Sequence, residues 1–172
     1  MSEGILVLCE SVNGTIKKTG LEILGKAQSL IESTGGVVTA LLIGSGDAAS
    51  LGGFGAQKVL HVDGDARNAA LVARALQQAI GSVSPALVLG GATAVGLDAF
   101  ARIAVRLKLG LGSEITELTS RDGAIVATRS QFAGKTFSDV AISGDCKMYT
   151  VRPGAFGLPS ASDSSAEVES LS

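Results

Sequence analysis

The sequence contains no tryptophan, and aromatic residues make up only 3% of its 172 positions. A core built on large rings is therefore excluded. Hydrophobic residues still reach 46%, so the core must consist mainly of Val, Leu, Ile and Ala, packed closely with the help of 23 glycines. A β-sandwich is expected to contain more aromatic and turn residues. The composition favours an α/β fold, and the length fits one domain with a sizeable core and a tail.

Positive charge is neither abundant nor clustered. The formal net charge is −2, and the Lys and Arg residues form no stripe and do not alternate with aromatic residues. We therefore expect no nucleic-acid partner. No apolar run approaches the length of a membrane span, and the first three residues lack the positive charge of a leader peptide. These features predict a cytoplasmic protein, unless a presequence has been removed.

Cysteine and histidine are also scarce. Cys9 and Cys146 lie far apart in apolar, strand-like runs, which predicts buried free thiols rather than a disulfide or a metal site. His61 is the single histidine, and its position in the strand-like run KVLHVDG favours a structural role over a catalytic one. No acid, base or nucleophile is grouped with it at a useful spacing.

Most of the chain alternates between short apolar runs and segments with helical periodicity. Strands are predicted at residues 4–9, 37–43, 58–62 and 86–89, and helices at 19–34, 66–80 and after Gly96, with one or two helical turns at 47–55. Strands that alternate with helices form a parallel sheet with right-handed crossovers and helices on both faces. The sequence therefore predicts a three-layer α/β sandwich with a mostly parallel sheet.

After Gly110 the pattern changes. Residues 114–119, 124–129, 136–142 and 146–151 are strand candidates separated by turn signals such as Asp122-Gly123. We expect antiparallel hairpin strands added at the edge of the sheet. Residues 157–172 contain six serines and three acidic residues but no basic one, so they are predicted to be a disordered linker, with residues 1–156 as the folded domain.

The central stretch from Pro85 to Leu107 carries the candidate site. A buried strand leads into a loop of small residues, from which Gly91, Thr93 and Gly96 are the candidate binding residues. Such a loop lets a ligand or another chain approach the backbone at the carboxyl end of a sheet. The competing interpretation, which we favour from the pattern alone, is a tight strand-to-helix turn whose glycines serve packing.

Other charged residues allow two interpretations each. Arg129 and Arg152 follow apolar strands and are either solvated strand ends, the favoured interpretation, or contacts for an anion. Asp98 near the start of the helix is expected to interact with the helix dipole rather than to act as a general base. The stretch GSGDAASLGG lacks the G-x-G-x-x-G spacing of a dinucleotide site.

Three stretches, taken in order, resemble one family. They are ILVLCES, LGGATAVGLDAFARIAVRLKLGLGSEITEL and ATRSQFAGKTFSDVAI with the later MYTVRPGAF. Together they are similar to the amino-terminal domain of the electron transfer flavoprotein alpha subunit, over about residues 4–156. The chain departs from the family pattern in that an Arg is replaced by Leu97, a Pro by Ala101, a Tyr-Gly-Gly by Phe132-Ala133-Gly134, and a His by Ser11.

The resemblance implies a nucleotide-hydrolase-like, Rossmann-like fold and a heterodimer with a beta subunit. That complex shuttles electrons from dehydrogenases to an acceptor oxidoreductase, in the bacterial cytoplasm or, in eukaryotes, the mitochondrial matrix. The principal FAD site would lie outside this chain, in a carboxyl-terminal domain after the linker, and AMP is allowed in the partner subunit. This predicts a scaffold domain, with no catalytic residue and no metal. The alternative is a stand-alone AMP- or ATP-binding module that uses Glu10-Ser11 and residues 91–96.

Overall fold

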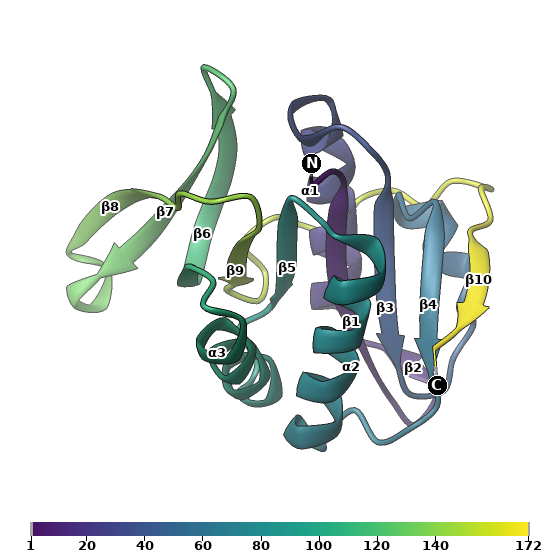
Figure 1. The fold of residues 1–172 in the computed structure, drawn as a ribbon. Helices are drawn as coiled ribbons and strands as arrows, with labels where there is room; N and C mark the ends of the chain where they lie inside the picture. The colour runs from purple at the N-terminus through teal and green to yellow at the C-terminus, as the bar shows by residue number, and fades with distance from the viewer. Residues whose placement is uncertain (1, 172) are drawn as a thin grey trace.

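The computed structural model describes residues 2–171, which form a ten-stranded sheet with helices on both faces (Figure 1). The α-helices are α1 (Lys18–Thr34), α2 (Ala69–Val83) and α3 (Ala94–Leu107), and the 3₁₀ helices are η1 (Ala49–Phe54) and η2 (Phe132–Gly134). The strands are β1 (Ile5–Val12), β2 (Thr15–Ile16), β3 (Val38–Ile43), β4 (Lys58–Val62), β5 (Leu87–Gly91), β6 (Leu111–Arg121), β7 (Ala124–Gln131), β8 (Thr136–Ala141), β9 (Lys147–Val151) and β10 (Glu167–Ser170).

The strands of the sheet follow the order β10-β4-β3-β1-β5-β9-β6-β7-β8, and the short β2 pairs only with β1. Neighbouring strands are parallel from β10 to β6, and antiparallel pairing joins β6 to β7, β7 to β8 and the short β2 to β1. In Figure 1 strands β6, β7 and β8 extend away from the body as an arm. The prediction of a mostly parallel α/β sandwich with added antiparallel strands is confirmed.

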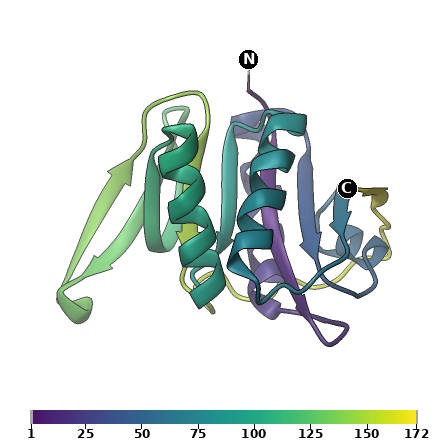
Figure 2. The ribbon, with the colours of Figure 1, turned by 60° about the horizontal axis from the view of Figure 1, so that its bottom comes forward.

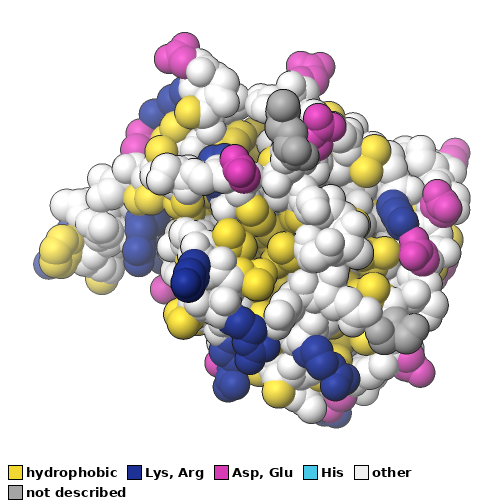
Figure 3. Space-filling view, in the orientation of Figure 1, with side chains coloured by type: hydrophobic (Ala, Val, Ile, Leu, Met, Phe, Trp, Pro, Cys, Tyr) yellow, Lys and Arg dark blue, Asp and Glu magenta, His cyan; other side chains and the backbone are white. Residues whose placement is uncertain are grey.

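The core lies in two layers, one on each face of the sheet. Ile5 and Val7 of β1 pack with α1, whereas Leu6 and Leu8 pack with α2 and α3, which lie side by side in Figure 2. Successive side chains of a strand point to opposite faces, so a strand covered on both faces has an uninterrupted apolar sequence. Figure 3 shows apolar side chains on this face of the molecule, while Leu6 and Leu8 of β1 are buried beneath the helices.

Strand β9 corrects one prediction. Residues 146–151 were expected to be antiparallel hairpin material at the sheet edge, but β9 lies parallel between β5 and β6. Its last four residues are buried, as are all five of β5. The apolar sequence of β9 therefore reflects a central position with cover on both faces, and the antiparallel addition consists of β6, β7 and β8 alone.

The carboxyl-terminal segment corrects a second prediction. Residues 157–172 were expected to be disordered, but as far as Leu171 the structure places them against the body, where β10 pairs in parallel with β4. The contact is made largely by backbone hydrogen bonds, for which a serine-rich composition gives no signal. That this segment leads on to a further domain stays a prediction.

Candidate functional site

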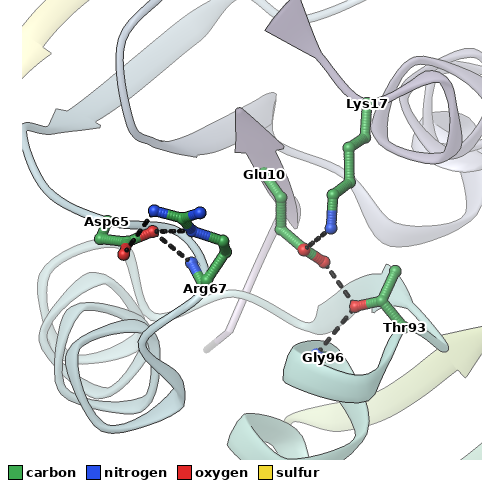
Figure 4. Close-up of polar contacts among 6 residues, drawn as sticks. All are labelled: Glu10, Lys17, Asp65, Arg67, Thr93 and Gly96. Carbon is green, nitrogen blue, oxygen red and sulfur yellow. Dashed lines mark hydrogen bonds and ion pairs between the residues drawn. The ribbon is translucent and has the colours of Figure 1, made fainter. Parts of the chain in front are cut away.

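The site candidates meet where the strand order changes direction. From β1 the chain proceeds to β3 and β4 on one side, and α2 then returns it to β5 on the other side of β1. In open α/β sheets, ligands bind in the crevice at the carboxyl ends of two such strands. Here the position of that crevice is occupied by contacts between Glu10, at the end of β1, and the loop from Gly91 to Gly96 after β5 (Figure 4).

Glu10 fills this crevice with a buried carboxylate. Its side chain is only 4% exposed. One oxygen, Oε1, accepts a hydrogen bond of 2.7 Å from the Thr93 hydroxyl, and Oε2 is paired with the Lys17 ammonium. Thr93 Oγ1 in turn accepts a 2.9 Å hydrogen bond from the backbone N–H of Gly96, so the same hydroxyl caps α3 (Figure 4). The four residues form one connected polar network.

This network determines what the crevice can accept. A phosphate group binds readily at a helix N-terminus where backbone N–H groups point into open space. In this chain the N–H of Gly96, at the start of α3, already donates to the Thr93 hydroxyl. The Glu10 carboxylate accepts from the same hydroxyl and so lies directly beside this helix end. An anion that entered here would meet the Glu10 carboxylate, and the nearby cation, Lys17, is already paired with that carboxylate.

A second hollow lies at the same edge of the sheet, next to β1, β3 and the start of α2. It measures about 300 Å³, and its wall includes Ser11, Ser45, Asp65 and Arg67. The Ser11 hydroxyl donates to the carbonyl of Ser45. Arg67 binds Asp65 through both Nε and an Nη atom, at 2.9 and 3.2 Å, and this hydrogen bonding holds the pKa of the Asp65 carboxyl below its ordinary value. The charged groups of this hollow thus satisfy each other.

The glycines of the central loop have packing roles. A Cβ atom on Gly91 would lie 2.8 Å from Thr19 Cγ2 of α1, and one on Gly96 would lie 2.0 Å from the Gly91 carbonyl oxygen. Both positions must be glycine, because the tight turn from β5 into α3 leaves no room for a side chain there. The geometry agrees with the packing interpretation for Gly91 and Gly96, while Thr93 is the loop residue with a polar role. A ligand role for these residues stays a prediction.

The charged candidates lie apart from the crevice. Arg129 is on β7, separated from β5 by β9 and β6, and its Nε is buried without a hydrogen-bond partner among the described residues. Arg152 is exposed after the end of β9. Asp98 binds Arg102 at 2.8 Å along α3, and this hydrogen bond lowers the pKa of the Asp98 carboxyl. An acid paired in this way is a poor general base.

The thiols and the single histidine offer no activated nucleophile. Burial, together with the charge of Glu10, raises the pKa of the Cys9 thiol to about 12, and burial raises that of Cys146 to about 11. His61 Nε2 lies 2.8 Å from the carbonyl oxygen of Gly44, which fits a structural role. Within residues 2–171 no three His, Cys, Asp or Glu side chains are placed to hold a metal ion. None of the helices described is long and apolar enough to span a membrane.

Lys17 is the site residue that sequence reasoning missed. Its position depends on β2, which turns back at Asn13-Gly14 and pairs with the end of β1, so that Lys17 N donates to the Glu10 carbonyl at 2.9 Å. The Asn-Gly turn was visible in the sequence. Together with β1 before it and the two-residue strand β2 after it, this turn is the signal that could have placed Lys17 beside Glu10.

Comparisons with known proteins point in one direction. The family model described as the electron transfer flavoprotein domain matches residues 5–172. Electron transfer flavoprotein subunit alpha of Clostridium acetobutylicum is 33% identical over 165 residues, which cover 90% of this chain and 48% of that protein. Protein FixB of Clostridium saccharobutylicum is 30% identical over 182 residues, covering 98% and 53%. Lactate dehydrogenase (NAD(+),ferredoxin) subunit LctC of Acetobacterium woodii is 30% identical over 164 residues, covering 91% and 39%. The chain thus spans about half the length, or less, of these relatives.

Proposed function

Since the chain belongs to the electron transfer flavoprotein domain family, we propose that it is the amino-terminal scaffold of an alpha subunit, which binds a beta subunit and does not hold the principal flavin. Two relatives in the comparison are named as an alpha subunit and as FixB, and the match runs through nearly all of this chain. The single observation that carries the proposal is this family match over residues 5–172.

The structure of the crevice supports a scaffold role over a nucleotide-binding role. The end of β1 and the start of α3 are where a nucleotide would be held in this fold type, and Glu10 closes that position. The principal FAD site then belongs to the half of the alpha subunit that this chain does not span. The stand-alone AMP- or ATP-binding module has no observation in its favour and is not proposed. The complex as a whole carries electrons from dehydrogenases to an acceptor oxidoreductase, with AMP, where present, in the beta subunit.

The arm formed by β6, β7 and β8 provides apolar surface for the subunit contact. Phe132 at its tip is 76% exposed and Phe137 on β8 is 66% exposed. Phe132 also adopts a positive φ of 49°, a conformation that is strained for a bulky side chain. Strain of this kind is retained where the surrounding structure or a partner requires it. We therefore assign the arm to the contact with the beta subunit.

The test is co-expression of the chain with the beta subunit from the same source, followed by native mass spectrometry and FAD titration. We expect a one-to-one complex, and no stoichiometric FAD on the chain alone. Phe137→Ser should weaken the complex, whereas Val105→Ser, which changes a side chain on α3 that is 81% exposed, should not. A chain that purifies with one FAD, or that forms no complex with the beta subunit, would contradict the proposed function.

A further inference from the structure

The carboxyl-terminal segment contacts all three layers of the fold. Pro159 lies against Gly25 of α1, on one face of the sheet. The chain then crosses η1 and adds β10 beside β4 at the sheet edge, where it is yellow in Figure 1. Leu171 finally packs against the apolar layer of α2 on the other face. A single segment of about a dozen residues therefore passes from one helical layer to the other around the edge of the sheet.

Backbone hydrogen bonds hold this segment against the body from Ser162 to Leu171. Ser162 N donates to the Gly53 carbonyl at 2.9 Å, and Ala166 N donates to the Ala49 carbonyl at 3.1 Å. Farther along, Glu167 N donates to the Gln57 carbonyl at 3.0 Å and Leu171 N to the His61 carbonyl at 2.8 Å. The partners belong to η1, to the residues after it and to β4, so these contacts follow one continuous strip of the body.

Three glycines shape the surface on which the segment lies. A Cβ atom on Gly25 would approach Pro159 Cγ to 2.6 Å, and one on Gly53 would approach the Ser162 carbonyl oxygen to 2.6 Å. A Cβ atom on Gly52 would lie 2.4 Å from the backbone of Ser165 and Ala166. Such distances are far inside van der Waals contact, so the segment can dock only because these positions carry no side chain.

Side-chain burial contributes little to the same contact. Among the described residues of the segment only Ala166 is buried, and the four side chains of β10 are all exposed. The Lys58–Glu169 ion pair is itself largely open to solvent. By contrast, β3 and β5 are buried throughout. Release of the segment would therefore leave the two core layers nearly intact, which is the property of a separately opening unit.

We propose that residues 158–171 form a clasp that docks on the Gly25–Gly52–Gly53 surface and undocks as one unit while the rest of the sheet stays folded. The docked clasp covers β4, and the undocked clasp leaves β4 as an open edge strand. Leu171 thus has two positions relative to α1 and α2, one in the docked state and one in the undocked state. This inference is independent of the proposed subunit contact, which lies on the arm at the opposite end of the sheet.

Hydrogen exchange of the full chain tests the clasp. After each exchange rate is corrected for the intrinsic rate of its amide, we expect the amides of Ser162, Ala166, Glu167 and Leu171 to show one common protection factor, lower than those of the β1 and β5 amides. Gly25→Ala should speed exchange of these four amides by about tenfold or more, because the new methyl meets Pro159, and should leave β5 unchanged. Gly81→Ala is the matched control, since Gly81 also lies in a helix but faces open space.

Two results would overturn the proposal. One is a protection factor for the four clasp amides equal to that of the β1 and β5 amides in the unmodified chain. This would mean that the segment opens only with the whole fold. The other is equal exchange of these amides in Gly25→Ala and Gly81→Ala. The first measurement needs no substitution, so the proposal remains falsifiable even if Gly25→Ala fails to fold.

Discussion

The polar network in the crevice gives the sharpest prediction for stability. Lys17→Met keeps the aliphatic stem of Lys17 but removes its charge, which leaves the buried carboxylate of Glu10 with the Thr93 hydroxyl as its hydrogen-bond donor. A hydrogen bond to a charged group contributes about 1.5–3 kcal/mol, and breaking a fully buried pair costs about 3–5 kcal/mol. Lys17 is 37% exposed, so water can replace part of its contribution. We expect a loss of about 2 kcal/mol in the free energy of unfolding.

A second substitution, at Glu10, tests whether the loss of stability comes from an unpaired buried charge or from altered packing. Glu10→Gln keeps an oxygen that can accept from Thr93 and leaves the ammonium of Lys17 free to bind water, so its cost should be smaller, about 1 kcal/mol. Once the carboxylate is gone, Lys17→Met no longer creates an unpaired buried charge. The double variant should therefore be more stable than the sum of the two single effects predicts, by about 1–2 kcal/mol.

Urea unfolding followed by circular dichroism measures all four proteins of this cycle, provided that the slope m stays constant. Additive effects of the two substitutions, or a loss below about 0.5 kcal/mol for Lys17→Met, would refute the reasoning. The refutation would extend to the site, because it would mean that Glu10 is solvated well enough in the crevice to leave room for an anionic ligand.

Three further outcomes are expected. Native protein at pH 8 should react slowly with a thiol reagent at Cys146 and more slowly still at Cys9, since burial raises both thiol pKa values, and both should react fully in urea; fast native labelling of Cys9 would contradict the structure. The hydrogen bond from Lys26 lowers the pKa of Glu117 below its unfolded value near 4.5, so the stabilising effect of this pair is complete above that pH and is lost as the pH falls. Glu117→Gln should therefore flatten the acid side of a curve of stability against pH, and an unchanged curve would count against the ion pair. Thr93→Ala should lower the free energy of unfolding by about 1 kcal/mol or more through loss of the α3 cap, while Thr93→Ser should retain most of it.

Local sequence patterns were sufficient for the central strands and helices. The strands β1, β3 and β5 were predicted because both faces are buried and their sequences are mainly apolar, with Thr39 as the polar residue of β3 and Glu10 and Ser11 near the end of β1. Helix starts were predicted less well. Helix α1 starts at Lys18 without a side-chain cap, and α2 starts at Ala69 because the Asn68 side chain accepts from Ala70 N and Leu71 N.

The remaining differences depend on contacts between distant parts of the chain. The chain does bend at Gly144-Asp145, just before β9. This local bend does not determine which strand β9 joins, because its position depends on pairing with the distant β5. The clasp depends on the shape left by Gly25, Gly52 and Gly53, which no composition rule for residues 157–172 can include. For the site, the sequence placed Glu10 and the loop after β5 at one sheet edge, while the Lys17 pairing required the path of β2.

The insertion of β9 between β5 and β6 has a consequence for the order in which the protein assembles as it is synthesised. Lys147 of β9 pairs with Leu87 of β5, 60 residues earlier. The pairings of β6 with β7 and of β7 with β8 are local, so these hairpins can form as soon as they emerge. They cannot join the sheet until β9 arrives, so a nascent chain that has left the ribosome as far as residue 141, while β9 is still inside the exit tunnel, should carry an antiparallel unit that is folded but unattached, with unpaired edges open to other nascent chains.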